Sequence, residues 1–177
     1  VLWIEPAPKM RLHDEVASRI VAGDGPTQQT LMQSLGYDGA GVTVAVADSG
    51  LDSGETNAMH PDLQGRVRAL FYYGTPGQLF DAADEHSHGT HVAGIIAGNG
   101  DSGETDENGF LYGLGVAPGA GIIGQRIFDG LGGYAPPPSF EKLTRDAKRA
   151  GADIGSNSWG DDTQGRYDLS SLEFDAL

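Results

Sequence analysis

The chain has 177 residues, which is long enough for one domain with its own hydrophobic core. Its 25 acidic residues against 11 Lys and Arg give a formal net charge of −14, which argues against nucleic acid and anionic membranes as partners. The absence of cysteine excludes disulfides, thiolate metal sites and a cysteine nucleophile, and no apolar run is long enough for a membrane span.

Apolar segments with strand character alternate with helical segments along the chain. The first helix is expected over Gln28–Leu35, with Thr27 as its N-cap and Gly36 at its end. The clearest strand is Val42–Ala47, a nearly continuous apolar run that is typical of a strand buried on both faces of a parallel sheet. The later elements are expected as strand 66–72, helix 89–98, strand 121–127, a helix through 150 capped by Ser139 and ended by Gly151, strand 152–156, and a helix that starts near 170.

This alternation predicts an α/β fold with a doubly wound parallel sheet and helices on both faces. Ligands of such sheets bind at the carboxyl ends of the strands. The last expected helix has no stop signal before Leu177, so we interpret the chain as a truncated part of a larger domain.

A carboxylate stands at the end of the clearest strand. Asp48 follows Ala45-Val46-Ala47 and precedes the turn Ser49-Gly50, so it is placed where sites form in parallel sheets. The simpler interpretation is that Asp48 caps the next turn.

A histidine stands at the first turn of a helix built from small residues. In His88-Gly89-Thr90-His91-Val92-Ala93-Gly94, small side chains permit tight packing, which would hold the His88 imidazole in the few rotamers that proton transfer requires. The alternatives are a surface histidine or a metal ligand. His88 and His91 could share a helix face, and Asp48 could supply the third ligand of a zinc site.

The two segments together resemble a known family. Asp48-Ser49-Gly50 after an apolar strand, followed by the His88–Gly94 block, is similar to the two N-terminal signatures of the subtilisin-like serine proteases (subtilases, peptidase S8). Leu114–Pro118 and Asn157–Gly160 resemble two further family segments and stand in the family's order. The resemblance spans about residues 14–165.

The resemblance implies a secreted serine endopeptidase that hydrolyses proteins or peptides with an Asp-His-Ser triad. His88 would be the general base and Asp48 would orient it. The family's serine, in a Gly-Thr-Ser motif, and its oxyanion-hole asparagine are not among these residues, so this segment alone is expected to be inactive. Two alternatives stay open: a non-catalytic subtilase-like binding module, and a metal-dependent hydrolase that uses Asp48, His88 and His91.

The resemblance also implies where substrate and calcium bind. Ser158-Trp159-Gly160 would pair with an extended substrate, and Leu131-Gly132-Gly133 would form the opposite wall, although residues 130–138 could also be a plain loop. Asp62 matches a calcium-ligand position of the family, and Asp101 and Asp106 lie in an oxygen-rich loop that suits calcium or is simply solvated. The chemistry itself would require no cofactor.

The N-terminal residues carry a separate resemblance. Residues 1–13 resemble the C-terminal tail of a subtilase propeptide, and the segment from Asp14 resembles the mature start of the larger, oxidatively stable alkaline branch. This implies a propeptide tail over 1–13 that acts as an intramolecular inhibitor, the N-terminal part of the catalytic domain over 14–177, and a processing site near His13–Asp14. The alternative is an ordinary N-terminal arm.

Overall fold

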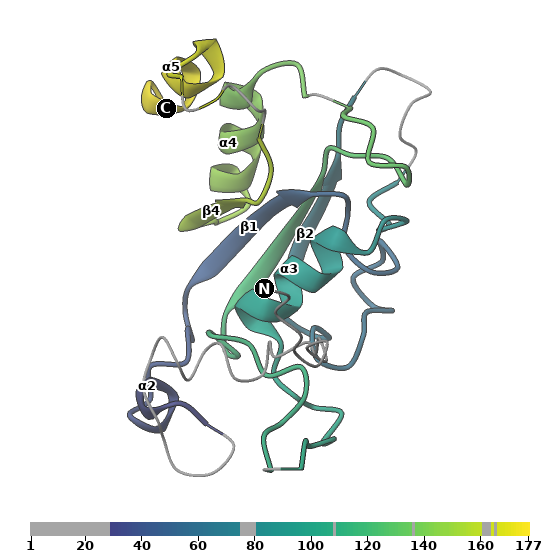
Figure 1. The fold of residues 1–177 in the computed structure, drawn as a ribbon, viewed down its shortest axis with the longest axis vertical. Helices are drawn as coiled ribbons and strands as arrows, with labels where there is room; N and C mark the ends of the chain where they lie inside the picture. The colour runs from purple at the N-terminus through teal and green to yellow at the C-terminus, as the bar shows by residue number, and fades with distance from the viewer. Residues whose placement is uncertain (1–28, 75–80, 108, 136, 161–163, 165) are drawn as a thin grey trace, which may run out of the picture.

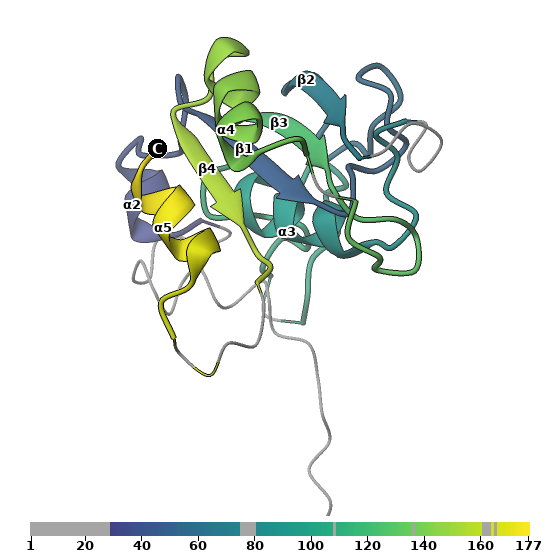
Figure 2. The same ribbon diagram turned by 90° about the horizontal axis from the view of Figure 1, so that it is seen from above.

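A parallel sheet with a helix on each face forms the centre of the molecule. The computed structural model describes residues 29–74, 81–107, 109–135, 137–160, 164 and 166–177. Within these residues the strands pair in the order β2-β3-β1-β4, and their bounds are β1 Thr43–Asp48, β2 Val67–Tyr72, β3 Gly121–Arg126 and β4 Ile154–Asn157. Helix α3 (His88–Ala97) covers one face and α4 (Phe140–Arg149) the other (Figures 1 and 2). The predicted α/β fold with a parallel sheet is confirmed.

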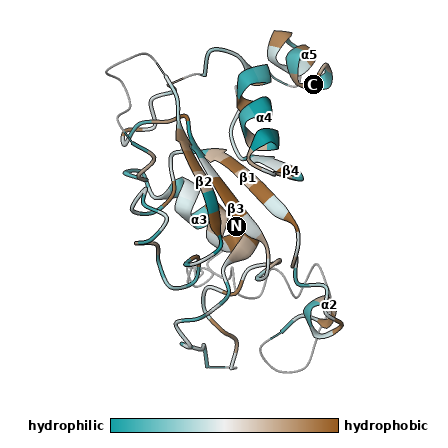
Figure 3. Cartoon of the chain, turned by 180° about the vertical axis from the view of Figure 1, so that it is seen from behind, coloured by the Kyte–Doolittle hydropathy of each residue, from teal (hydrophilic) through white to brown (hydrophobic). Residues whose placement is uncertain are grey.

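Strand β1 is buried on both faces, which explains its continuous apolar sequence. Val44 and Val46 belong to the hydrophobic cluster that contains Ala93 of α3, whereas Ala45 packs in the cluster of Ala147 of α4. Alternate residues of a strand point to opposite faces, so each helix meets its own set of β1 side chains. Figure 3 shows that β1 is largely hydrophobic and that α4 is largely hydrophilic.

Polar caps determine where the helices begin. Ser139 caps α4 as predicted, because its side chain accepts a hydrogen bond from the Lys142 N–H at 3.0 Å. The predicted cap of the first helix was wrong: α2 is the shorter helix Leu31–Ser34, and its N-cap is Thr30. Thr30 and Gln33 form a reciprocal capping box, which the Thr-x-x-Gln pattern signals in the sequence.

The other bounds differ from the predicted ones by one or two residues. Asp48 is the last residue of β1 rather than the residue after it, and β4 begins at Ile154 rather than at 152. The expected last helix is α5 (Leu169–Asp175), capped by Asp168. The predicted propeptide tail over 1–13 and the processing site near His13–Asp14 lie outside the described residues.

Within the described ranges, no helix combines the length and the apolar character needed to span a bilayer.

Candidate active site

The end of β1 and the start of α3 bring Asp48 and His88 together. The Nδ1 atom of His88 lies 2.7 Å from Oδ1 of Asp48. The Asp48 side chain is 3% exposed and that of His88 is 47% exposed. A buried carboxylate at Nδ1 favours the tautomer with its proton on that nitrogen, which leaves Nε2 free to accept a proton. The predicted proximity of the two groups is confirmed.

The two oxygens of Asp48 have different surroundings. Oδ1 also accepts a hydrogen bond from the Ser49 N–H at 2.7 Å. Oδ2 is buried and has no hydrogen-bond partner in the part of the chain that the structure describes. Buried polar atoms are paired in most folded proteins, and the exceptions concentrate at functional sites.

Gly89 allows α3 to start directly against the end of β1. A Cβ atom at this position would lie 2.3 Å from the carbonyl oxygen of Gly50 and 3.0 Å from Cβ of Asp48. Only glycine fits so close to backbone, because a side chain would push the helix away from the strand. The glycine after His88 therefore fixes the distance across which the imidazole reaches Asp48.

Helix α3 is capped by residues outside the helix and not by its own N-cap. Ser87 has a left-handed φ of 75° and makes no side-chain cap hydrogen bond. Instead, the Gly89 N–H donates to Ser49 Oγ at 2.9 Å, and the Thr90 N–H donates to Asp84 Oδ2 at 2.8 Å. The sequence analysis missed Asp84, although an aspartate shortly before a helix is a common capping signal.

Hydrogen bonds control the charge state of Asp84. Burial raises its pKa, but the hydrogen bonds that its carboxylate accepts from Thr90, Ser49 and the Ser87 N–H outweigh burial and hold the pKa below the usual value. Asp84 is therefore an anion at neutral pH, at the positive end of the α3 dipole.

The acid–base pair opens into a cavity of about 220 Å³. Three of the predicted substrate-binding residues, Gly132, Ser158 and Trp159, line this cavity together with Asp48 and His88. The other three, Leu131, Gly133 and Gly160, are not part of its lining. The lining also contains residues that sequence reasoning missed, namely Ser49, His86 and Phe128.

Trp159 forms an aromatic wall beside the pair. Its indole Nε1–H donates to the Ala47 carbonyl oxygen at 2.9 Å, which anchors the ring to the end of β1. The surrounding rings have centroids 5.8 to 6.2 Å away and belong to Phe128, Tyr134, Phe140 and Phe174. The ring is thus held in one orientation next to Asp48.

A hydrogen-bonded turn contributes Gly132 to the lining of the cavity. Asp129 accepts hydrogen bonds from the N–H groups of Gly133 at 2.7 Å and Leu131 at 2.9 Å, and these bonds lower its pKa. Gly132 at the tip has a φ of 78°, a left-handed conformation that favours glycine. Leu131 is 96% exposed and does not line the cavity in whose wall it was predicted.

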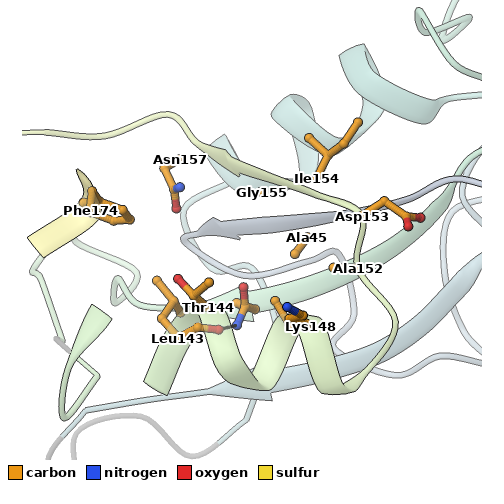
Figure 4. Close-up of a pocket in the computed structure, with 12 residues that line it drawn as sticks. Ala45, Leu143, Thr144, Lys148, Ala152, Asp153, Ile154, Gly155, Asn157 and Phe174 are labelled. Atoms are coloured by element: carbon orange, nitrogen blue, oxygen red, sulfur yellow. Dashed lines mark hydrogen bonds between the residues drawn. The ribbon is translucent and has the colours of Figure 1, made fainter. Parts of the chain in front are cut away.

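A second cavity, of about 280 Å³, lies beside the sheet at β4 and contains neither Asp48 nor His88. Figure 4 shows Leu143 and Thr144 of α4 along one side of it and Phe174 of α5 at one end. The chemistry-bearing pair belongs to the smaller cavity.

The predicted metal ligands are not gathered into metal sites. In the described ranges, no group of three or more His, Asp or Glu side chains is placed to hold an ion, which applies to Asp62, Asp101 and Asp106 and equally to Asp48, His88 and His91. The Asp62 carboxylate accepts a hydrogen bond from the Ser102 N–H at 3.1 Å, and that of Asp106 accepts one from the Phe110 N–H at 2.9 Å. These carboxylates support loops, and calcium binding stays a prediction.

Proteins of a known family are similar to this chain in sequence. The model of the Subtilase family matches residues 39–176. Subtilisin E of Bacillus subtilis (strain 168) is 37% identical over 118 residues, which cover 67% of this chain and 27% of subtilisin E. Fervidolysin of Fervidobacterium pennivorans is 35% identical over 144 residues, which cover 77% of this chain and 18% of fervidolysin.

A solved structure agrees in fold. The CspB protease of Clostridium perfringens superposes with a TM-score of 0.56 at 17% identity, over 90% of this chain and 37% of that protein. The chain spans about a quarter of the length of subtilisin E and less of fervidolysin. The chain has a parallel sheet with the Asp48–His88 pair at the carboxyl end of strand β1, and the family model matches residues 39–176. The chain therefore belongs to the subtilase family.

Proposed function

We propose that the full-length protein is a serine endopeptidase, with Asp48 and His88 as two members of an Asp-His-Ser triad. The observation that supports this most is the 2.7 Å contact between a buried carboxylate and an imidazole that opens on a cavity. The serine is proposed to stand in a Gly-Thr-Ser motif outside residues 1–177.

The proposed mechanism assigns one role to each group. As the serine hydroxyl attacks the peptide carbonyl carbon, Nε2 of His88 takes its proton, and later gives that proton to the leaving amine. Asp48 accepts the hydrogen bond from Nδ1–H, keeps the imidazole in this tautomer and stabilises the imidazolium, while remaining ionised itself.

The substrate is proposed to be an extended peptide segment of a protein. It would lie between Ser158-Trp159-Gly160 and the turn at Leu131-Gly132-Gly133, and pair with backbone groups as an added strand does. The shared cavity of Gly132, Ser158 and Trp159 with the acid–base pair supports this placement.

We also propose that the protein is secreted and made with an inhibitory propeptide that ends near His13. The family membership supports secretion, and the resemblance of residues 1–13 supports the propeptide. The N-terminal sequence of the active protein in the culture medium tests both: it is expected to begin near Asp14, whereas an intracellular protein that still carries residues 1–13 would contradict them.

A pair of histidine variants tests the function. In the full-length protein, His88→Ala is expected to lower kcat towards a peptide substrate by about 10⁶-fold, the size of loss known for the same histidine of subtilisin itself. His91→Ala, on the same helix, is expected to retain most of the activity. Loss of activity in both variants and on adding a chelator would favour the metal-dependent alternative, and an inactive wild type would favour the binding module.

A further inference from the structure

The carboxylate of Asp84 accepts hydrogen bonds from residues near Asp48 and from residues near His88 in the chain. Oδ1 accepts from Ser49 Oγ at 2.8 Å and from the N–H groups of His86 at 3.1 Å and Ser87 at 2.8 Å. Oδ2 accepts from the Thr90 N–H at 2.8 Å and from Thr90 Oγ1 at 2.5 Å. One side chain thus holds the turn that precedes α3 and the first turn of the helix.

The partners of Asp84 are the chain neighbours of the two reacting groups. Ser49 follows Asp48 directly, and Ser87 precedes His88 directly. Ser49 Oγ donates to Asp84 and accepts from the Gly89 N–H, so it links the end of β1 to the start of α3. A shift of Asp84 would therefore move Asp48 and His88 relative to each other.

We propose that Asp84 is a positioning residue of the acid–base pair: it holds the end of β1 and the first turn of α3 at the separation at which His88 meets Asp48. The proposal rests on the proposed function and adds to it a residue that does not touch the substrate. Loss of such a residue would lower the reaction rate because Asp48 and His88 would no longer be aligned. Displacements of about 1 Å at an active site can lower the rate about a hundredfold.

The substitution Asp84→Asn in the full-length protein tests this role. An amide has one acceptor oxygen, so the variant keeps the hydrogen bonds of Oδ1 or those of Oδ2 but not both sets. We expect kcat towards a peptide substrate to fall about 10- to 100-fold with little change in KM. We also expect the low-field NMR signal of the His88 Nδ1 proton to weaken or broaden.

Two further variants separate positioning from stability. Asp168→Ala removes a carboxylate that caps α5 in a similar way, through the Ser171 N–H at 2.8 Å, and is expected to lower thermal stability but not kcat. Ser49→Ala removes only the hydroxyl link and is expected to lower kcat even if Asp84→Asn does not fold.

Each result of these measurements either supports or overturns the positioning role of Asp84. A folded Asp84→Asn protein, or a folded Ser49→Ala protein where the first does not fold, with kcat within twofold of wild type would overturn the positioning role. If wild type shows no peptidase activity, the proposed function fails, and the His88 proton signal alone then decides about Asp84. An unchanged signal in the variant would refute the proposal, and a weakened one would support it.

Discussion

Gly89 is the residue that sets how closely the acid–base pair can approach. Its Cα faces the Gly50 carbonyl oxygen at a distance that leaves no space for a methyl group. Gly94, about one and a half turns further along α3, faces open space, with no neighbouring atom within 4 Å of a Cβ built there. Steric contact therefore explains the glycine at position 89 but not the one at position 94.

We expect Gly89→Ala to lower the free energy of unfolding by about 1–3 kcal/mol, because the added methyl group must displace backbone. Peptidase activity should fall with it, since the displaced helix carries His88. Gly94→Ala is the matched control and should be neutral or stabilise the helix by up to about 1 kcal/mol. Urea unfolding of both variants checks this, and equal stability of the two would contradict the steric account.

The sequence predicted Asp48 and His88, the proposed acid–base pair, but not Asp84, which we propose positions them. Asp48 and His88 stand in short motifs next to a strong strand signal and a strong helix signal. The proposed role of Asp84 depends on its hydrogen bond with Ser49, which joins two residues 35 positions apart. Periodicity and capping patterns describe neighbours along the chain, so they do not reveal such a contact.

Helix α4 combines a local start signal with a long-range polar contact. Ser139 caps its first turn, as the sequence predicted. On its buried side, the Tyr73 hydroxyl donates to Asp146 at 3.1 Å and accepts from Gln125 Nε2 at 2.9 Å, and burial is the main reason that the pKa of Tyr73 is raised. The cap could be predicted from the sequence, whereas the contact from β3 through Tyr73 to α4 could not.

Ser139→Ala is expected to destabilise the protein by about 1 kcal/mol, because the Lys142 N–H loses its acceptor. Ser139→Asp should restore most of the stability, since aspartate is an equally good N-cap. Thermal unfolding measures both. If the alanine and aspartate variants were equally destabilised, the loss would not come from the cap.

Part of the architecture of the sheet could be predicted from the sequence, and part could not. The alternation of strands and helices predicted the parallel sheet, and the apolar run of β1 predicted its place in the interior. The order β2-β3-β1-β4 places β3 between two strands that precede it in the chain. That order depends on which long-range contacts form, so the pattern of each separate strand leaves it open.

Two aspartates with lowered pKa values predict how the stability of the molecule depends on pH. The pKa values of Asp84 and Asp146 are both lowered: burial raises each, but hydrogen bonds outweigh it, from Thr90 to Asp84 and from Lys142 to Asp146. An aspartate with a lowered pKa adds stability that is complete above its unfolded value near 4 and is lost as the pH falls through the folded value.

We therefore expect the unfolding temperature to fall as the pH is lowered from about 5 to about 3. Asp84→Asn should reduce the steepness of this fall, because the substituted group no longer titrates. Protonation also relieves the repulsion that accompanies a net charge of −14, so the comparison between variant and wild type is the informative quantity. An identical slope for both would show that Asp84 does not contribute.

The proposed function requires that Asp48 and His88 activate a serine elsewhere in the full-length protein. Its most direct test is the reaction of that protein with a serine-directed fluorophosphonate, followed by mass spectrometry of the intact and digested protein. We expect one adduct, on a single serine, that forms far more slowly in His88→Ala. No adduct, or an adduct that forms at the same rate in that variant, would contradict the account.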